Sequence, residues 1–294
     1  MGNHCPSITP VSIEFYGGTN QALNSSSYGQ STVPNAVICG RDCHADPNCK
    51  SFSYHRCSRV CELHRGTRRD TNLVETTGSV YFDSRQDTPN LSVEYLDDRY
   101  CSCKELLKAG YNTSGVYTIY PAAYSGDGLR VHCDMDTAGG GWVTIQRRQD
   151  GSVNFFRNWT EYRAGFGNLT GEFWLGNAAL QGLTTFGGPW VIRFDFEDWY
   201  GNTAWAEYSG FQLLGGAYTL SYDVYNKNST AGNSLWQIEN RPFQTEDNHN
   251  SFFDVPSVCQ GGWWYDFIPC GKVNLNGVYY SKNDQSFDST DAIK

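Results

Sequence analysis

The chain has 294 residues, with 22 Lys and Arg against 31 Asp and Glu, which gives a net charge of −9. Hydrophobic residues make up 39% and aromatic residues 15%, whereas charged residues make up only 18%. This composition predicts a folded chain of one large or two ordinary domains and excludes disorder. The negative charge argues against nucleic acid as a partner, and no apolar run approaches the roughly 20 residues of a membrane span.

Cysteines and glycosylation sequons favour an extracellular protein. There are eleven cysteines, most of them in tight groups, as expected for disulfides in an oxidising compartment. The first residues contain no charged and apolar leader, so we expect a secreted protein whose signal peptide is not part of this chain. A cytosolic protein whose cysteines bind metal is the alternative. Predicted glycosylation sites are Asn24, Asn90, Asn112, Asn158, Asn168 and Asn228.

Cysteine density divides the chain into two predicted domains. Six of the eleven cysteines lie between Cys5 and Cys61, whereas the long aromatic stretch after Cys133 has only Cys259 and Cys270. The polar, proline-containing stretch 84–96 is typical of a linker. We therefore expect a cysteine-rich domain over 5–83 and a second domain over 97–294, without a collagen stalk or a coiled coil.

In the first domain, Asn35 is suited to cap a helix that carries Cys39 and Cys43 on one face, because residues four apart are neighbours there. The following stretch, 49–55, alternates Phe52 and Tyr54 with polar residues. This alternation predicts a strand with one buried face. A second strand is expected to begin at Cys61.

The run Cys-x3-Cys-x5-Cys-x-Ser-Phe-x-Tyr over 39–54, followed by Cys-x-Leu at 61–63, resembles the PAN/apple module. In that module a helix is cross-linked to the antiparallel sheet beside it. The alternative is a zinc site that adds His44, His55 or His64, but five close cysteines exceed a tetrahedral set. The resemblance implies disulfides Cys39–Cys61 and Cys43–Cys49, and the remaining Cys5 and Cys57 are candidates for a third pair, which spacing alone does not fix.

The second domain carries a series of motifs rich in glycine and aromatic residues, at 103–110, 114–119, 131–137, 139–148, 150–155, 165–169, 171–177, 261–265 and 274–277. In this order they resemble the fibrinogen C-terminal domain of ficolins, tenascins, angiopoietins and fibrinogen chains. The predicted fold class is therefore α+β, a PAN/apple-like module followed by a fibrinogen C-terminal-like domain.

The resemblance to the fibrinogen C-terminal domain implies disulfides Cys103–Cys133 and Cys259–Cys270. It leaves Cys101 unpaired, available for an interchain bridge in a disulfide-linked oligomer. A pairing with Cys5 or Cys57 and a free thiol are the alternatives.

Most of these motifs predict architecture rather than chemistry. The glycines 139–141 suit a tight turn with close backbone approach, and the residues after them alternate as in a strand. Large aromatic residues dominate burial in protein cores, so we expect core positions for Trp159, Trp174, Trp199, Trp205 and Trp236.

The resemblance implies calcium as the cofactor, held by two aspartates two positions apart. Asp247 matches the first of them, but His249 stands at the second. Neutral imidazole is a poor ligand for calcium, so we expect weakened calcium binding unless Glu246 or Asp254 substitutes.

Ficolin-like members hold acetyl groups in a pocket beside that site. Trp263, Trp264 and Tyr265 match its aromatic stretch, but the spacer to Cys270 is longer and Gly271 replaces a histidine. The segment from Cys270 resembles instead the angiopoietin version, whose members bind a protein receptor through this region. The predicted ligand-binding residues are Trp264, Tyr265, Cys270, Gly271 and Asn274.

No catalytic motif of a hydrolase, metalloprotease or nucleotide-binding enzyme is present, so we expect a non-enzymatic protein. After Tyr280 the family continues into a closing strand that this sequence lacks, which predicts a sheet with an unpaired edge. We predict a secreted, innate-immune type of lectin for glycans or acetylated groups. A receptor ligand or an extracellular-matrix adhesion protein is the alternative, and a structural matrix component is the third. The expected partners are glycans or a cell-surface or matrix protein, with no nucleic acid and no membrane insertion.

Overall fold

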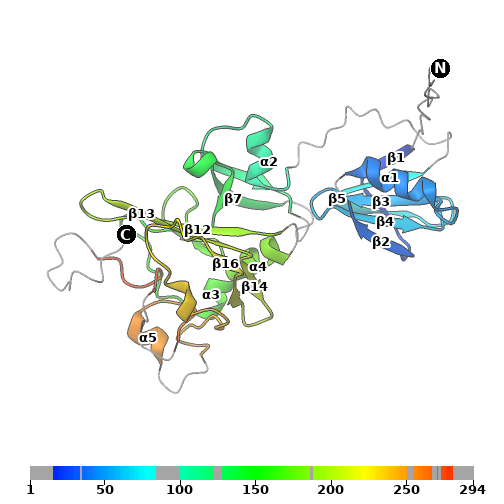
Figure 1. Cartoon of the computed structure of the whole chain (residues 1–294). Helices are drawn as coiled ribbons and strands as arrows, with labels where there is room; N and C mark the ends of the chain where they lie inside the picture. The colour runs from blue at the N-terminus through cyan, green and yellow to red at the C-terminus, as the bar shows by residue number, and fades with distance from the viewer. Residues whose placement is uncertain are drawn as a thin grey trace, which may run out of the picture. The chain divides into compact units, whose positions relative to one another are not determined.

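The computed structural model describes residues 16–33, 35–83, 100–121, 128–185, 188–249, 254–266, 270 and 273–280. The chain divides into two compact units, Met1–Asp98 and Arg99–Lys294 (Figure 1). Both combine short helices with antiparallel strands, which is the predicted α+β class. Cys5, the predicted linker 84–96 and the end of the chain, 281–294, lie outside the described residues. Among the described residues, no helix has the length and apolar character that crossing a membrane requires.

The N-terminal unit is a five-stranded antiparallel sheet with one helix, α1 (Ala36–Ala45), across it (Figure 1). As predicted, Asn35 caps this helix: its side-chain oxygen accepts a hydrogen bond from the N–H of Ile38 at 3.0 Å. The strand order is β1-β5-β3-β4-β2, with β1 Tyr16–Leu23, β2 Gly29–Thr32, β3 Ser51–His55, β4 Val60–His64 and β5 Leu73–Asp83.

Two disulfides fasten α1 in place. Cys39 is joined to Cys61 of β4, and Cys43 to Cys49 just before β3, which are the pairs that the resemblance implies. Bonded in this way, these cysteines are not thiolate ligands, so the zinc alternative is wrong. Around them Phe52, Tyr54 and Val33 complete a small apolar core.

The prediction for the strand after α1 is wrong in one respect, because β3 is buried on both faces. Phe52 and Tyr54 pack in the apolar core, but Ser51 and Ser53 on the opposite face are just as deeply buried. Ser51 donates a hydrogen bond to the carbonyl of Gly66 at 2.7 Å, and the hydroxyl of Ser53 lies 3.1 Å from Nε2 of His64. Burial lowers the pKa of His64. Polar residues occupy this second face because hydrogen-bond partners are buried with them.

The C-terminal unit consists of several small antiparallel sheets and short helices. Its sheets have the orders β6-β7-β8, β10-β11-β9, β12-β13-β16 and β14-β15. The helices are α2 Cys103–Lys108, α3 Trp159–Ala164, α4 Asn177–Thr185 and α5 Val255–Cys259, with two 3₁₀ turns, η1 Thr137–Gly139 and η2 Leu235–Gln237. The strands are β6 Gly115–Ile119, β7 Leu129–Asp134, β8 Trp142–Thr144, β9 Gln146–Arg147, β10 Phe166–Gly167, β11 Phe173–Trp174, β12 Val191–Glu197, β13 Thr203–Ser209, β14 Gln212–Leu214, β15 Thr219–Ser221 and β16 Val224–Tyr225.

The predicted tight turn precedes β8. Gly140 has φ of 66°, and a Cβ atom there would lie 2.1 Å from the carbonyl oxygen of Met135. Only glycine fits this approach of two backbones. The disulfide Cys103–Cys133 then joins α2 to β7 beside the turn.

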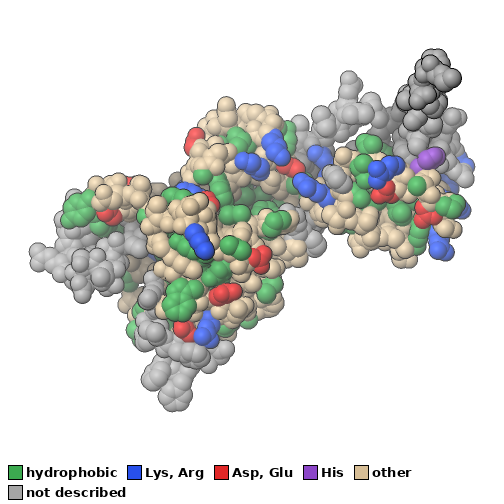
Figure 2. All heavy atoms as spheres, in the orientation of Figure 1, with side chains coloured by type: hydrophobic (Ala, Val, Ile, Leu, Met, Phe, Trp, Pro, Cys, Tyr) green, Lys and Arg blue, Asp and Glu red, His purple; other side chains and the backbone are tan. Residues whose placement is uncertain are grey.

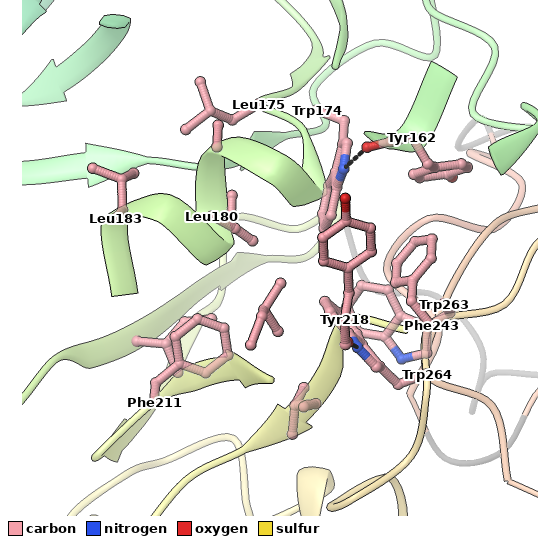
Figure 3. Packing of buried hydrophobic residues seen from close by; sticks show 14 of the residues in the cluster. Tyr162, Trp174, Leu175, Leu180, Leu183, Phe211, Tyr218, Phe243, Trp263 and Trp264 are labelled. Carbon is pink, nitrogen blue, oxygen red and sulfur yellow. Dashed lines mark hydrogen bonds between the residues drawn. The ribbon is translucent and has the colours of Figure 1, made fainter. Parts of the chain in front are cut away.

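An aromatic core fills the centre of this unit (Figure 3). Tyr162, Trp174, Phe243 and Trp264 lie with ring centroids 4.9–6.3 Å apart. The hydroxyl of Tyr162 donates to the carbonyl of Phe155 at 2.7 Å, so this buried phenol keeps a partner.

The tryptophan prediction holds fully for only one residue. Trp174 is buried, whereas Trp159, Trp199 and Trp205 are half-buried. Trp236 on η2 is 56% exposed, so its predicted core position is wrong. A single turn of 3₁₀ helix buries only one of its sides, and in η2 the buried side is occupied by Leu235.

The prediction that Cys101 is unpaired is also wrong. Cys101 and Cys57 are both disulfide-bonded. Cys101 therefore has no thiol with which to bridge a second chain. The disulfide-linked oligomer expected through a free thiol of this residue therefore loses its basis.

Candidate recognition site

A tight hairpin forms the first part of the predicted site. Gln244 and Trp263 face each other in an antiparallel bridge, with N–H to carbonyl distances of 2.9 and 3.1 Å. Thr245 and Asn248 then exchange two backbone hydrogen bonds across the turn. Thr245 is fully buried and anchors the hairpin, whereas Glu246, Asp247 and Asn248 are exposed.

Asp247 fastens this hairpin to α3. Its Oδ1 accepts a hydrogen bond from the hydroxyl of Thr245 at 2.7 Å and another from the backbone N–H of Trp159 at 2.8 Å. Trp159 is the first residue of α3, and the N–H groups in the first turn of a helix have no partner within the helix. In a capping box, the side chain of Asn158 accepts the N–H of Glu161 and the side chain of Glu161 accepts the N–H of Asn158. The carboxylate of Asp247 therefore completes the cap of α3 from a distant part of the sequence.

His249 faces an acidic residue at the start of α5. Its Nε2 lies 3.8 Å from Oδ1 of Asp254. The same Asp254 oxygen accepts the N–H of Ser257 at 3.1 Å and caps α5. Hydrogen bonding from Ser257 lowers the pKa of the Asp254 carboxyl group, with a smaller contribution from His249.

These residues do not fit calcium. Calcium prefers six or more oxygen ligands, several of them carboxylates. Asp247 already accepts two hydrogen bonds, position 249 offers an imidazole, and Asp254 caps a helix. In the described ranges there is no group of three acidic, histidine or cysteine side chains suited to a metal. The carboxylates at the predicted calcium position thus act as hydrogen-bond acceptors at the surface of the hairpin and at the start of α5.

The two aromatic residues predicted to contact a ligand are buried. Trp264 donates its Nε1–H to the carbonyl of Tyr218 at 2.7 Å, and Tyr265 donates its hydroxyl to the carbonyl of Gly261 at 2.7 Å. Each is only 3% exposed, and burial raises the pKa of Tyr265. They support the site from within the core rather than offering ring faces to solvent, and Figure 3 shows Trp264 among the buried aromatic residues.

The remaining predicted ligand residues lie around a disulfide. Cys270 is half-buried and joined to Cys259 at the end of α5, as the resemblance implies. Gly271 lies outside the described residues. Asn274 donates its Nδ2–H to the carbonyl of Cys259 at 3.1 Å. The structure therefore brings Cys270 and Asn274 together at α5.

Sequence reasoning missed Gln244, and it named Trp263 in the aromatic stretch of the pocket but not among the ligand-binding residues. Both are at least nine-tenths buried, yet Oε1 of Gln244 and Nε1 of Trp263 have no hydrogen-bond partner. Directly opposed residues of an antiparallel bridge project to the same face, so the side chains that carry this acceptor and this donor lie on one face of the hairpin. Oδ1 of Asn274 is a third buried atom without a partner. No local pattern announces these atoms, because their isolation depends on the residues packed around them.

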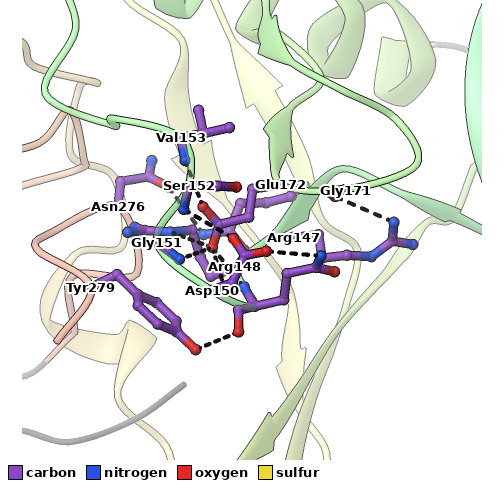
Figure 4. Close-up of polar contacts among 12 residues, drawn as sticks. Arg147, Arg148, Asp150, Gly151, Ser152, Val153, Gly171, Glu172, Asn276 and Tyr279 are labelled. Carbon is purple, nitrogen blue, oxygen red and sulfur yellow. Dashed lines mark hydrogen bonds and ion pairs between the residues drawn. The ribbon is translucent and has the colours of Figure 1, made fainter. Parts of the chain in front are cut away.

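A buried carboxylate, that of Glu172, holds the loop that follows Arg148 (Figure 4). The N–H groups of Gln149, Asp150 and Gly151 donate to Oε1 of Glu172 at 2.7–3.0 Å, and that of Val153 donates to Oε2 at 3.0 Å. Burial alone opposes ionisation, but these four donors lower the pKa of Glu172.

The neighbouring Arg148 continues this network to the segment after Asn274. Its Nη1 donates to the carbonyls of Gly277 at 2.8 Å and Leu275 at 3.3 Å, and its guanidinium carbon lies 4.0 Å from the ring centroid of Phe155. Asn276 donates to the carbonyl of Gly262 at 2.8 Å. Through these bonds the 275–277 segment is fixed against the residue that precedes Trp263.

The binding region is defined here as hairpin 244–248, α5, and segments 261–265 and 273–277. Val258 on α5 is 68% exposed. Figure 2 shows acidic, basic and hydrophobic side chains interspersed on one face of the chain, whereas the charged residues of the binding region itself, Glu246 and Asp247, are both acidic. Such a surface suits neutral or mixed partners better than a polyanion.

Comparison with known proteins gives the same division of the chain. The model of the C-terminal globular domain of fibrinogen β and γ chains matches residues 99–293, and the PAN domain model matches 16–86. Ficolin-3 of Homo sapiens is 46% identical over 182 residues, 60% of this chain and 59% of that protein. Angiopoietin-4 of Bos taurus is 42% identical over 193 residues, 64% of this chain and 38% of that protein.

Solved structures agree. The fibrinogen-like globe domain of human ANGPTL6 has 39% sequence identity and a TM-score of 0.56, and the match covers 62% of this chain and 80% of that domain. The chain thus spans 38% of the length of the angiopoietin and 59% of that of the ficolin.

Proposed function

This chain belongs to the fibrinogen C-terminal domain family, and from that premise we propose that it is a secreted lectin-type recognition protein that binds acetylated groups of glycans. Proteins with such domains, ficolins and angiopoietins among them, are extracellular, non-enzymatic recognition or ligand proteins. The relatives are secreted, which supports the same location for this chain. In this proposal the PAN module adds a second contact, with a protein or a carbohydrate.

The observation that carries the proposal is the pair of buried polar atoms at the hairpin. An acetamido group has one acceptor, its carbonyl, and one donor, its N–H. Nε1–H of Trp263 and Oε1 of Gln244 are the complementary donor and acceptor, and the indole of Trp263 offers apolar contact for the methyl group. Leaving each buried atom unpaired costs about 1–3 kcal/mol, which a matching ligand would recover. Both atoms are covered, so binding requires the side chains over them to move.

The test is retention of the secreted chain on a resin of immobilised N-acetylglucosamine. We expect retention in calcium and in EDTA alike, because the residues at the predicted calcium position do not fit the ion. Free N-acetylglucosamine should elute the chain, and glucose, which lacks the acetamido group, should not. No retention of a folded chain would contradict the proposal.

A variant pair isolates the proposed donor. Trp263→Phe removes Nε1–H and keeps an aromatic ring, so retention should fall strongly. Trp236→Phe makes the same chemical change on the exposed η2 and should leave retention unchanged. Tryptophan fluorescence during unfolding verifies that both variants are folded. Equal retention of the two variants would remove Trp263 from the proposal.

A second candidate function is that of a protein receptor ligand. Val258 is the residue through which it would be tested, because this apolar side chain is 68% exposed on α5, beside the Cys259–Cys270 disulfide of the binding region. The angiopoietin similarity favours the same function. This candidate predicts saturable binding to a cell surface that Val258→Asp abolishes and N-acetylglucosamine does not compete with.

A further inference from the structure

We propose that an N-linked glycan on Asn158 controls access to the binding region. The sequon is Asn158-Trp159-Thr160, and both Asn158 and Thr160 are exposed. The effect of the glycan on ligand capture rests on the proposed function, whereas the modification and the shielding of the hairpin do not.

The geometry of Asn158 allows modification without loss of its structural role. Its Oδ1 accepts the N–H of Glu161 at 2.9 Å and closes the capping box of α3. Its Nδ2, the atom to which the sugar is attached, makes no hydrogen bond in the described part of the chain. A glycan on Nδ2 therefore leaves the helix cap intact.

The same residue lies at the edge of the binding region. The peptide N–H directly after it, that of Trp159, donates to Asp247 in the hairpin at 2.8 Å. The Trp159 ring lies 6.3 Å from that of Phe243, the residue before Gln244. The sugar is thus attached one residue from the backbone that contacts the hairpin, and an N-glycan is bulky and mobile.

The other described sequons of this unit have different surroundings. Asn112 follows α2, which lies at the opposite end of the C-terminal unit from α5 in Figure 1. Asn168 belongs to the turn between β10 and β11, and its Oδ1 accepts hydrogen bonds from the N–H and the hydroxyl of Thr170. Beside Asn228, the hydroxyl of Thr230 is bonded to the N–H of Trp205. Of the four described sequons of this unit, Asn158 is therefore the one whose neighbouring residue, Trp159, donates a hydrogen bond to the hairpin.

A glycan at this place discriminates by size. A small soluble sugar passes beside it, whereas a polymer or a cell surface carrying the same sugar meets it first. Chains without the glycan should therefore capture large ligands better while keeping the same affinity for the free sugar.

The experiment compares the secreted chain with Thr160→Ala, Thr160→Ser and Asn112→Gln. Thr160→Ala destroys the sequon but keeps the Asn158 cap, Thr160→Ser keeps both, and Asn112→Gln removes a glycan at the opposite end. Peptide mass spectrometry measures occupancy of Asn158. We expect a several-fold rise in retention on the N-acetylglucosamine resin for Thr160→Ala alone, with unchanged affinity for the free sugar.

A second measurement needs no ligand. Glu246 in the hairpin is exposed, so a carbodiimide can couple its carboxylate to a polyethylene glycol amine, a probe much larger than a sugar. We expect coupling to Glu246 to be several-fold faster in Thr160→Ala than in Thr160→Ser, with the exposed Asp195 as an internal reference. Faster coupling without retention of any chain would refute the lectin function and support the shielding. An Asn158 without a glycan in the secreted chain, or equal coupling rates, would overturn the inference.

Discussion

Replacing Asp247 by Ala tests whether this carboxylate fastens the hairpin to α3 or binds calcium. The change removes the acceptor of two hydrogen bonds. Thr245 is fully buried, so its hydroxyl loses its partner at a cost of about 1–3 kcal/mol, and the N–H of Trp159, which water reaches, adds about 1 kcal/mol. We expect the free energy of unfolding to fall by about 3 kcal/mol, which corresponds to a drop of roughly 6–12 °C in the melting midpoint of a domain of this size.

Tryptophan fluorescence is the assay of choice. All nine tryptophans lie between Trp142 and Trp264, so the signal reports only on the C-terminal unit. Asp247→Asn, which keeps Oδ1, should lose less than Asp247→Ala. Each protein is unfolded in calcium and in EDTA, and the two midpoints should agree for each. If calcium stabilises the natural chain by several degrees and Asp247→Ala abolishes that gain, Asp247 is a metal ligand and the reasoning is refuted.

Three further predictions concern the polar interior and the cysteines. Glu172→Gln should lower the free energy of unfolding by about 3 kcal/mol, because an amide N–H would face backbone donors. Since the pKa of Glu172 is lowered in the folded chain, the natural chain should lose this stability as the pH falls below about 4.5, whereas the variant should not. Denaturant titrations at several pH values measure both effects. Because burial lowers the pKa of His64, the folded N-terminal unit should be fully stable above about pH 6.5 and weaken below it, and a pH-independent melting midpoint by circular dichroism would contradict this. Alkylation of the unreduced chain should leave Cys101 unlabelled, and a labelled Cys101 peptide in mass spectrometry would disprove its disulfide.

Much of the N-terminal unit could be predicted from local sequence. Asn35 as a helix cap and Cys39 and Cys43 on one helix face follow from helical geometry. The second buried face of β3 could not be predicted in this way. Ser51 and Ser53 resemble surface residues in the sequence, and only the partners Gly66 and His64 explain why they are buried.

The recognition site shows the same division more sharply. The sequence by itself determined the family and the glycine turn, because both depend on residue types at fixed spacing, and the resemblance to that family implied four disulfide pairs. Only the tertiary structure decided that Trp264 and Tyr265 are buried and that Asp247 caps α3. The partners of that last bond, Asp247 and Trp159, are 88 residues apart. A hydrogen bond over such a distance depends on how the intervening chain folds, and no local pattern encodes it.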